Sequence, residues 1–174
     1  SRLPRVKIAA ARLLRTPARG PAHAASFIPQ RYLLLAEALF PRRGELGRIV
    51  YHELCHFLWP RLRRGRGVYE AALAREWKAG TAGELGYSSA LAKQGLKNPM
   101  IRARDRRWRH YLCESFCDTG AYLLLRNAGH GRRRHSEWTL AARFRAARFR
   151  AWAEAAGLSD LDGGSFFVRR KSRS

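Results

Sequence analysis

Residues 45–60 read ELGRIVYHELCHFLWP, and this stretch organises the rest of the chain. Its apolar side chains recur at helical spacings, at Leu46, Ile49, Val50 and Phe57. An α-helix repeats about every 3.6 residues, so the pattern indicates an amphipathic helix with one apolar face. Pro60 lacks the backbone N–H that a helix interior needs, so we expect the helix to cover Glu45–Trp59 and to end there.

The predicted helix carries the motif HELCH, which runs from His52 to His56. Side chains four residues apart lie above one another on a helix, so these two histidines can present two imidazoles to one metal ion. Glu53 lies beside them and can take a proton from a water that the metal polarises. The motif predicts one bound Zn²⁺ ion with Glu53 as the general base. The alternative is a pair of ordinary surface or core-capping histidines.

A catalytic zinc site takes three protein ligands and leaves one position open, so a third ligand is needed. The metzincin pattern is excluded, because Trp59 and Leu62 stand where it requires Gly and His. The best candidate is Glu114, in the segment LCESFCDTG of residues 112–120. Asp118, four residues later, can accept a hydrogen bond from the non-ligating nitrogen of a zinc histidine. The segment is otherwise apolar or small, and a buried acid in such surroundings needs a partner.

HExxH followed by ExxxD resembles the gluzincin branch of the zincin metallopeptidases, which includes thermolysin and neprilysin. The resemblance covers the two short segments that begin at His52 and Glu114. It implies that His52, His56 and Glu114 bind zinc, that Glu53 is the general base, and that Asp118 holds a ligand histidine. It also implies hydrolysis of peptide bonds in a peptide or protein substrate.

Two roles stay open between several residues. The histidines His110, His130 and His135 would complete an all-histidine site, as in Spartan-type proteases that act on DNA–protein crosslinks. The other acids that remain as a third ligand are Glu70, Glu76 and Glu84. The gluzincin resemblance further implies a Tyr or His that stabilises the oxyanion, for which the candidates are Tyr87, His110, Tyr111, His130 and His135.

The three cysteines, Cys55, Cys113 and Cys117, show no spacing of a disulfide framework. Their odd number favours a reducing compartment, and we expect a cytoplasmic protein. Cys113 and Cys117 are four residues apart on the predicted glutamate helix, so a cysteine-containing zinc site is an alternative. Free cysteines more often pack as small buried hydrophobes, and this is the favoured interpretation.

With 174 residues, of which 46% are hydrophobic, the chain suits a single domain that covers residues 1–174. We expect a basic N-terminal helix within residues 1–20 and a loose basic tail over residues 163–174. Between them we expect short strands over Ala25–Leu35 and helices over Val68–Ala79, Ile101–Arg126 and Glu137–Ala156, the last with Ser136 as its N-cap and Gly157 as its terminator. This order predicts a mainly helical, zincin-like α+β domain with a small sheet before the HExxH helix.

The chain has 35 Lys and Arg against 13 Asp and Glu, a net charge of +22. Such a balance favours polyanionic partners, nucleic acid first, or acidic peptide substrates. The arginines gather at 102–109, 132–134 and 143–150, and for the last group the favoured interpretation is a core-packing helix with solvated arginines. The runner-up function is therefore a nucleic-acid-associated protein, either a Spartan-like protease or a non-catalytic DNA- or RNA-binding domain with a structural metal site. No apolar run approaches the roughly 20 residues that cross a bilayer.

Overall fold

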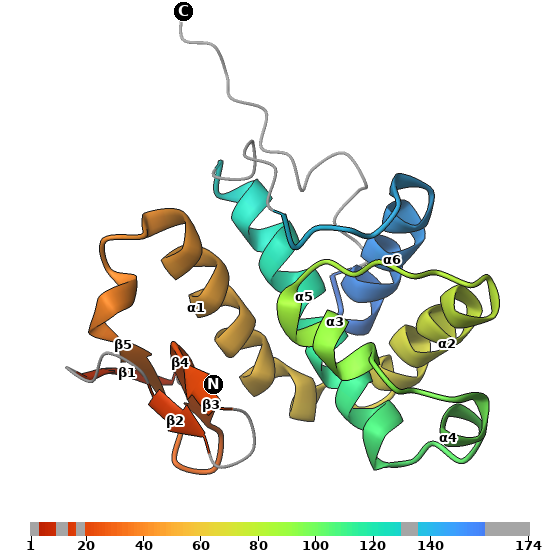
Figure 1. Cartoon of the computed structure of the whole chain (residues 1–174), viewed down its shortest axis with the longest axis horizontal. Coiled ribbons are helices and arrows are strands. Elements are labelled where there is room, and N and C mark those ends of the chain that lie inside the picture. Colours follow the sequence, from red (N-terminus) through yellow and green to blue (C-terminus); the bar gives the residue numbers. More distant parts are fainter. Residues whose placement is uncertain (1–3, 10–13, 17–19, 130–135, 159–174) are drawn as a thin grey trace, which may run out of the picture.

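The computed structural model describes residues 4–9, 14–16, 20–129 and 136–158, in which strands come first and helices follow (Figure 1). The strands are β1 (Arg5–Ala9), β2 (Leu14–Thr16), β3 (Gly20–Ala22), β4 (Ala24–Phe27) and β5 (Tyr32–Ala36). The helices are α1 (Arg43–Leu58), α2 (Gly65–Lys78), α3 (Tyr87–Lys93), α4 (Asn98–Arg102), α5 (Arg106–Asn127) and α6 (Ala142–Ala155), with 3-10 turns at Glu37–Leu39 and Trp59–Arg61. The predicted mainly helical α+β fold, with its sheet before the HExxH helix, is confirmed.

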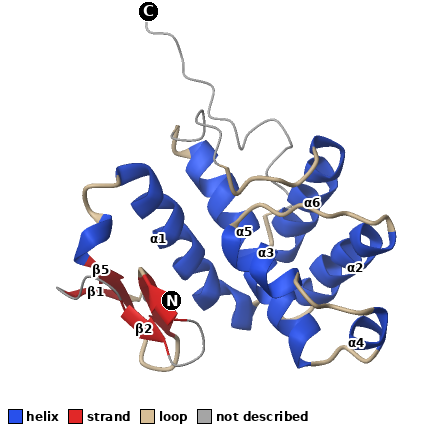
Figure 2. Ribbon diagram, in the orientation of Figure 1, coloured by secondary structure: helices blue, strands red, loops and turns tan. Residues whose placement is uncertain are grey.

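The central strand of the mixed three-stranded sheet is β5, with β1 parallel to it on one side and β4 antiparallel on the other. A separate antiparallel pair joins β2 and β3. Figure 2 shows the strands gathered at one end of the molecule, with α1 between them and the remaining helices. β4 is an edge strand that packs against α1, which brings its residues close to the HELCH motif.

The predicted N-terminal helix is wrong, because β1 and β2 occupy its described residues. Val6 and Ile8 alternate with Arg5 and Lys7, which is the two-residue period of a strand. β1 also pairs along its full length with β5, from Arg5 opposite Tyr32 to Ala9 opposite Ala36. This pairing depends on residues far along the chain, so it outweighs the local helical composition.

Helix α1 is buried on two sides. One face packs against the sheet, where Leu33, Leu35 and Leu39 form an apolar cluster with Phe57. The other face turns His52 and Cys55 toward α5. The helix therefore packs between the sheet and α5, and this packing fixes the direction in which its histidines point.

Helix α5 is the centre of the helical part, and it contacts α1, α2, α3 and α6 (Figure 1). Phe116 and Trp152 stack in the main apolar cluster with ring centroids 5.3 Å apart. Gly120 makes this approach possible, since a β-carbon there would overlap the sulfur of Cys55 and the Trp152 ring.

Several predicted helix ends are corrected. The pattern over Ile101–Arg126 is two helices, because Asp105 accepts a hydrogen bond from the backbone N–H of Trp108 and starts α5 anew. Helix α3 is not among the predicted helices.

The last helix begins at Ala142 rather than at Glu137, so Ser136 is not its N-cap. The backbone N–H groups of Thr139 and Leu140 instead donate to the carbonyl of Glu84, at 2.8 Å each. Gly157 follows the helix with φ of 72°, as a terminator should. The predicted tail over residues 163–174 lies outside the described residues.

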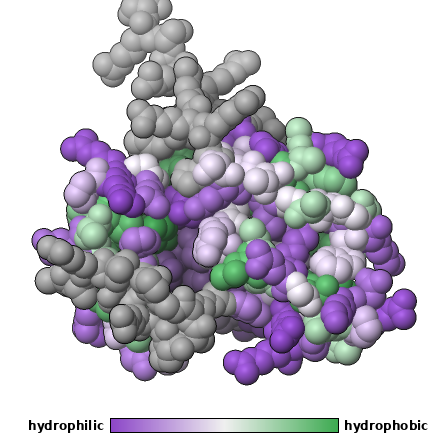
Figure 3. Space-filling model, in the orientation of Figure 1, coloured by the Kyte–Doolittle hydropathy of each residue, from purple (hydrophilic) through white to green (hydrophobic). Residues whose placement is uncertain are grey.

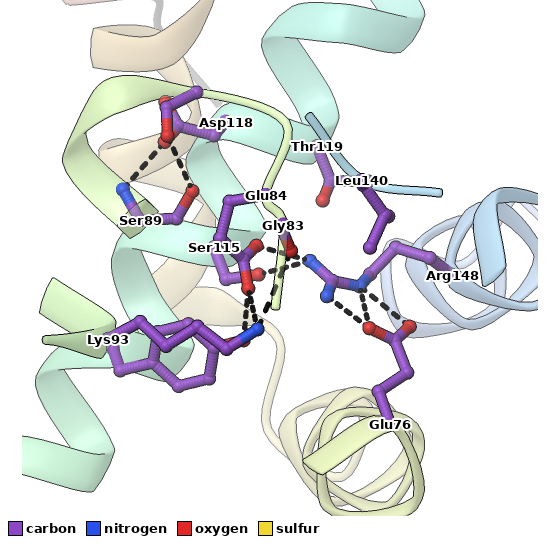
Figure 4. A network of polar contacts seen from close by, with 12 residues as sticks. Glu76, Gly83, Glu84, Ser89, Lys93, Ser115, Asp118, Thr119, Leu140 and Arg148 are labelled. Atoms are coloured by element: carbon purple, nitrogen blue, oxygen red, sulfur yellow. Dashed lines mark hydrogen bonds and ion pairs between the residues drawn. The ribbon is translucent and has the colours of Figure 1, made fainter. Parts of the chain in front are cut away.

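Arg148 was predicted among solvated arginines, and this is wrong, because its side chain is fully buried. Figure 4 shows its guanidinium between two carboxylates, those of Glu76 and Glu84. Burial disfavours the charged form of Glu84, but Arg148 and Lys93 outweigh this and lower its pKa. A buried cation needs such partners, and the network joins α2, α3, α5 and α6 behind the HELCH helix.

The visible face in Figure 3 is mostly hydrophilic, with apolar side chains in small patches, as the high charge of the sequence leads one to expect. No helix in the described ranges is both long and apolar enough to cross a membrane.

Candidate metal centre

The structure brings His52, His56 and Glu114 together between α1 and α5. Their ligand atoms all lie within 4.8 Å of one another. His52 Nε2 is 3.1 Å from His56 Nε2 and 3.5 Å from Glu114 Oε2, and the distance from His56 Nε2 to the same oxygen is 3.9 Å. Glu114, which is far from the two histidines in the sequence, thus converges with them on one point.

The three distances suit one ion. Zinc binds imidazole nitrogen and carboxylate oxygen at about 2.0–2.2 Å, so tetrahedral donors lie about 3.4 Å apart. The observed separations fall on both sides of that value. Two histidines and one glutamate also form a donor set that is typical of catalytic zinc. The three side chains could therefore hold one metal ion of the size of Zn²⁺.

Asp118 holds the first of these histidines. Its Oδ1 lies 2.7 Å from His52 Nδ1, and its Oδ2 accepts the backbone N–H of Ser89 at 2.8 Å (Figure 4). When His52 donates from Nδ1, its Nε2 is free to face Glu114 and His56. Asp118 therefore selects the tautomer that a metal ligand requires.

Helix α3 completes the setting of Asp118. Its N-terminal turn has Gly86 at the cap position, so no side chain of α3 itself caps it. The carboxylate of Asp118 does so from α5, through Ser89. A β-carbon on Gly86 would overlap this carboxylate, which explains why glycine occupies the position. Gly86 and Ser89 carry no local pattern that sequence analysis could have recognised.

Burial lowers the pKa of His52, but its hydrogen bond and charge interaction with Asp118, with help from Glu114 and Glu53, raise it to about 10. His56 shows a raised pKa as well, since its contacts with Cys113 and Glu114 outweigh burial. Without a metal, the carboxylates around His52 and His56 therefore favour protonation of these histidines, and the same negative charges would favour a bound cation.

Glu53 lines the same cleft as the ligand group and is held by β4. Ser26 Oγ donates to Glu53 Oε2 at 2.5 Å and also lies 3.0 Å from the Glu53 backbone carbonyl. This contact fixes a carboxylate beside the two histidines. A single serine in a strand gives no sequence signal, and only the packing of β4 on α1 reveals it.

The cleft has a volume of about 670 Å³. His23 and Ala24 line it from the β4 side, Arg48 and Ile49 from α1, and Tyr87 and Leu91 from α3. Arg48 lies one turn before His52 and pairs with Glu137 at 3.0 Å. The ligand group therefore opens into a groove large enough for part of a peptide chain.

The other ligand candidates are placed elsewhere or lie outside the described residues. Glu70 accepts from Trp108 and pairs with Arg104, while Glu76 and Glu84 bind Arg148. His110 is beside the group, with Nδ1 3.6 Å from Glu114 Oε1, but is not one of its members. His130 and His135 lie outside the described residues.

Comparisons with protein-family models, curated proteins and solved structures find no match to this chain. The gluzincin resemblance therefore stays an expectation that depends on its two short motifs. The geometry of the side chains carries the functional argument instead.

Proposed function

We propose that the protein is a zinc-dependent peptidase. The observation that carries the proposal is the convergence of His52, His56 and Glu114 on one point, with Asp118 behind His52 and Glu53 at the same cleft. A buried set of donors with these separations is costly for a fold unless it holds a cation or protons. The adjacent open groove favours a catalytic site over a closed structural one.

The division of labour follows from the contacts. Bound zinc would polarise a substrate carbonyl and make a water acidic enough to act near neutral pH. Glu53 would accept the proton of the attacking water and pass it to the leaving amine. Ser26 keeps the Glu53 carboxylate pointing into the cleft during both transfers. Asp118 keeps His52 in the ligating tautomer.

Two features of the cleft support an extended peptide as the substrate. The outer edge of β4 is unpaired among the described residues, and an extended chain can pair with such an edge. Tyr87 lines the opposite wall and is 61% exposed, so its hydroxyl can reach a substrate oxyanion. Tyr111, another candidate for that role, is buried and donates to Glu84. The charge of +22 favours acidic peptides.

The test is hydrolysis of a mixed peptide library by wild type and Glu53→Gln, with zinc content measured in both. Loss of the general base should lower turnover by about 10²–10⁴-fold, while the zinc content stays unchanged. Glu45→Gln, which alters another cleft-lining acid on α1, is the matched control and should retain turnover. Equal hydrolysis by wild type and Glu53→Gln would refute the assignment.

Exposed arginines support contact with nucleic acid as a second property. The side chains concerned are Arg102, Arg104, Arg106, Arg107 and Arg109, along α4 and the start of α5. If these arginines bind phosphates, the logarithm of the affinity for a DNA duplex should fall linearly with the logarithm of the salt concentration. An affinity that does not change with salt would remove phosphate contacts as its basis.

A further inference from the structure

His56 has a second nitrogen, and it faces sulfur. Its Nδ1 lies 3.5 Å from Cys113 Sγ, on the side of the ring opposite to the zinc-ligand group. Cys117 joins them, and the donor atoms of these three residues lie within 4.8 Å of one another. Cys55 is near enough to interact electrostatically with Cys113, so all three cysteines of the chain gather where α1 meets α5. All three are free thiols.

The separations suit metal binding. At the bond lengths of Zn²⁺, about 2.0–2.1 Å to nitrogen and 2.3 Å to sulfur, a nitrogen and a sulfur on one tetrahedral ion lie about 3.6 Å apart. The observed distance from His56 Nδ1 to Cys113 Sγ is 3.5 Å. Cys113 and Cys117 are one helical turn apart on α5, so both thiols can reach the same ion. Cys113 and His56 are each partly exposed, which leaves a path from solvent.

We propose that His56, Cys113 and Cys117 form a second metal site that takes Cu⁺. Thiolates are soft donors that select Cu⁺ or Zn²⁺ over harder ions, and imidazole binds both. Because the proposed zinc site already lies on the other side of the His56 ring, we assign the thiol site to Cu⁺. The ion is not oxidised or reduced on binding. Each thiol forms a sulfur–metal bond and releases its proton to solvent.

The two sites share His56, and this makes them antagonistic. An imidazole binds metal through both nitrogens only after it has lost its last ring proton. Binding of the second ion therefore costs more free energy than binding of the first. Cu⁺ at the thiol site should therefore weaken zinc binding by His52, His56 and Glu114. This coupling rests on the proposed function, whereas the thiol site itself does not.

The site is tested with reduced full-length protein under anaerobic conditions, titrated with Cu⁺ against a chromogenic Cu⁺ chelator. We expect one Cu⁺ per chain, and an affinity at least tenfold lower in Cys113→Ser and in Cys117→Ser. Cys55→Ser is the matched control, since it removes a neighbouring thiol that is outside the donor group, and it should bind as wild type does. Wild-type affinity in both serine variants, or equal loss in Cys55→Ser, would overturn the proposal.

Two further measurements keep the result independent of folding and of the zinc site. Bound Cu⁺ should slow alkylation of Cys113 in the unaltered chain at least tenfold, and unchanged alkylation would contradict the site. Glu114→Gln removes a zinc ligand but no thiol, so it should retain Cu⁺ binding even if the chain never binds zinc. Loss of Cu⁺ binding in Glu114→Gln would show that the ion occupies the His52, His56 and Glu114 group instead.

Discussion

Replacing Asp118 with Asn removes one negative charge next to His52 and changes almost no volume. Asp118 is 2% exposed, and its Oδ1 lies 2.7 Å from His52 Nδ1. The Asn carbonyl can still accept the backbone N–H of Ser89. Its NH₂ group then faces the Nδ1–H of His52, and two donors cannot form a hydrogen bond. The variant should fold, because one of the two contacts of the side chain survives.

The expected loss of zinc affinity is about 10–100-fold, the range for removing a carboxylate that orients a zinc histidine. This corresponds to about 1.4–2.7 kcal/mol. The loss should depend on pH, because the contact with Asp118, together with Glu114 and Glu53, outweighs burial and raises the pKa of His52 to about 10. Below that pH the wild type must release a proton from His52 to bind zinc, so its apparent affinity rises as the pH rises toward 10.

Asp118→Asn lowers the pKa of His52, so the variant meets less competition from protons. The advantage of the wild type in zinc affinity should therefore grow as the pH rises toward 10 and should narrow toward pH 6. A role for Asp118 in folding alone would not produce this convergence.

The assay is competition with a zinc chelator at several values of pH, together with thermal unfolding. Asp105→Asn is the matched control, since Asp105 also accepts a backbone N–H at a helix start but lies at the beginning of α5, away from the zinc ligands. It should leave zinc affinity unchanged. The reasoning is refuted if the ratio of the zinc affinities of wild type and folded Asp118→Asn stays constant between pH 6 and pH 9, or if Asp105→Asn loses as much affinity.

Three other predictions follow from single contacts. Gly86→Ala should destabilise the fold by about 1–3 kcal/mol and lower the zinc affinity, because the added β-carbon displaces Asp118. The β-carbon of Gly67→Ala in α2 meets open space, so equal stability of the two variants in urea would contradict this prediction. Arg148→Met should destabilise the fold by about 3–5 kcal/mol, because Glu76 loses its cation and Glu84 keeps only Lys93. The exposed Arg150→Met should change stability by less than about 0.5 kcal/mol, and similar denaturation midpoints of the two variants would count against the network. Ser26→Ala should lower turnover about tenfold or more and leave the zinc content unchanged. Ser88→Ala, which alters another serine of the same cleft, should keep the turnover of wild type, and wild-type turnover in Ser26→Ala would contradict the role of Ser26.

Local patterns predicted the parts of the fold that depend on nearby residues. The HELCH helix has a strong 3.6-residue period and a proline after it, and α1 ends one residue from the expected position. Glu114 and Asp118 were identifiable because acids in an apolar segment need a partner, and the structure places both at His52. Here the chemistry of the side chains was as informative as their spacing.

The features that sequence analysis missed depend on distant partners. β1 forms because β5 pairs with it, and the short alternation of Val6 and Ile8 with Arg5 and Lys7 does not by itself outweigh the helical composition around it. Arg148 repeats the pattern of its solvated neighbours, and only the positions of Glu76 and Glu84 show that it is buried. Ser26 is a similar case, because its hydrogen bond to Glu53 exists only where β4 packs against α1.

Elemental analysis of the purified protein, after exposure to zinc and removal of loosely bound metal, shows whether His52, His56 and Glu114 bind the ion. We predict one zinc per chain in wild type, and loss of that zinc in His52→Ala and in Glu114→Gln. Glu70→Gln alters another partly buried acid, one that contacts Trp108 and Arg104, and should keep the zinc. A wild type without zinc, or a Glu114→Gln variant that retains it in full, would contradict the account.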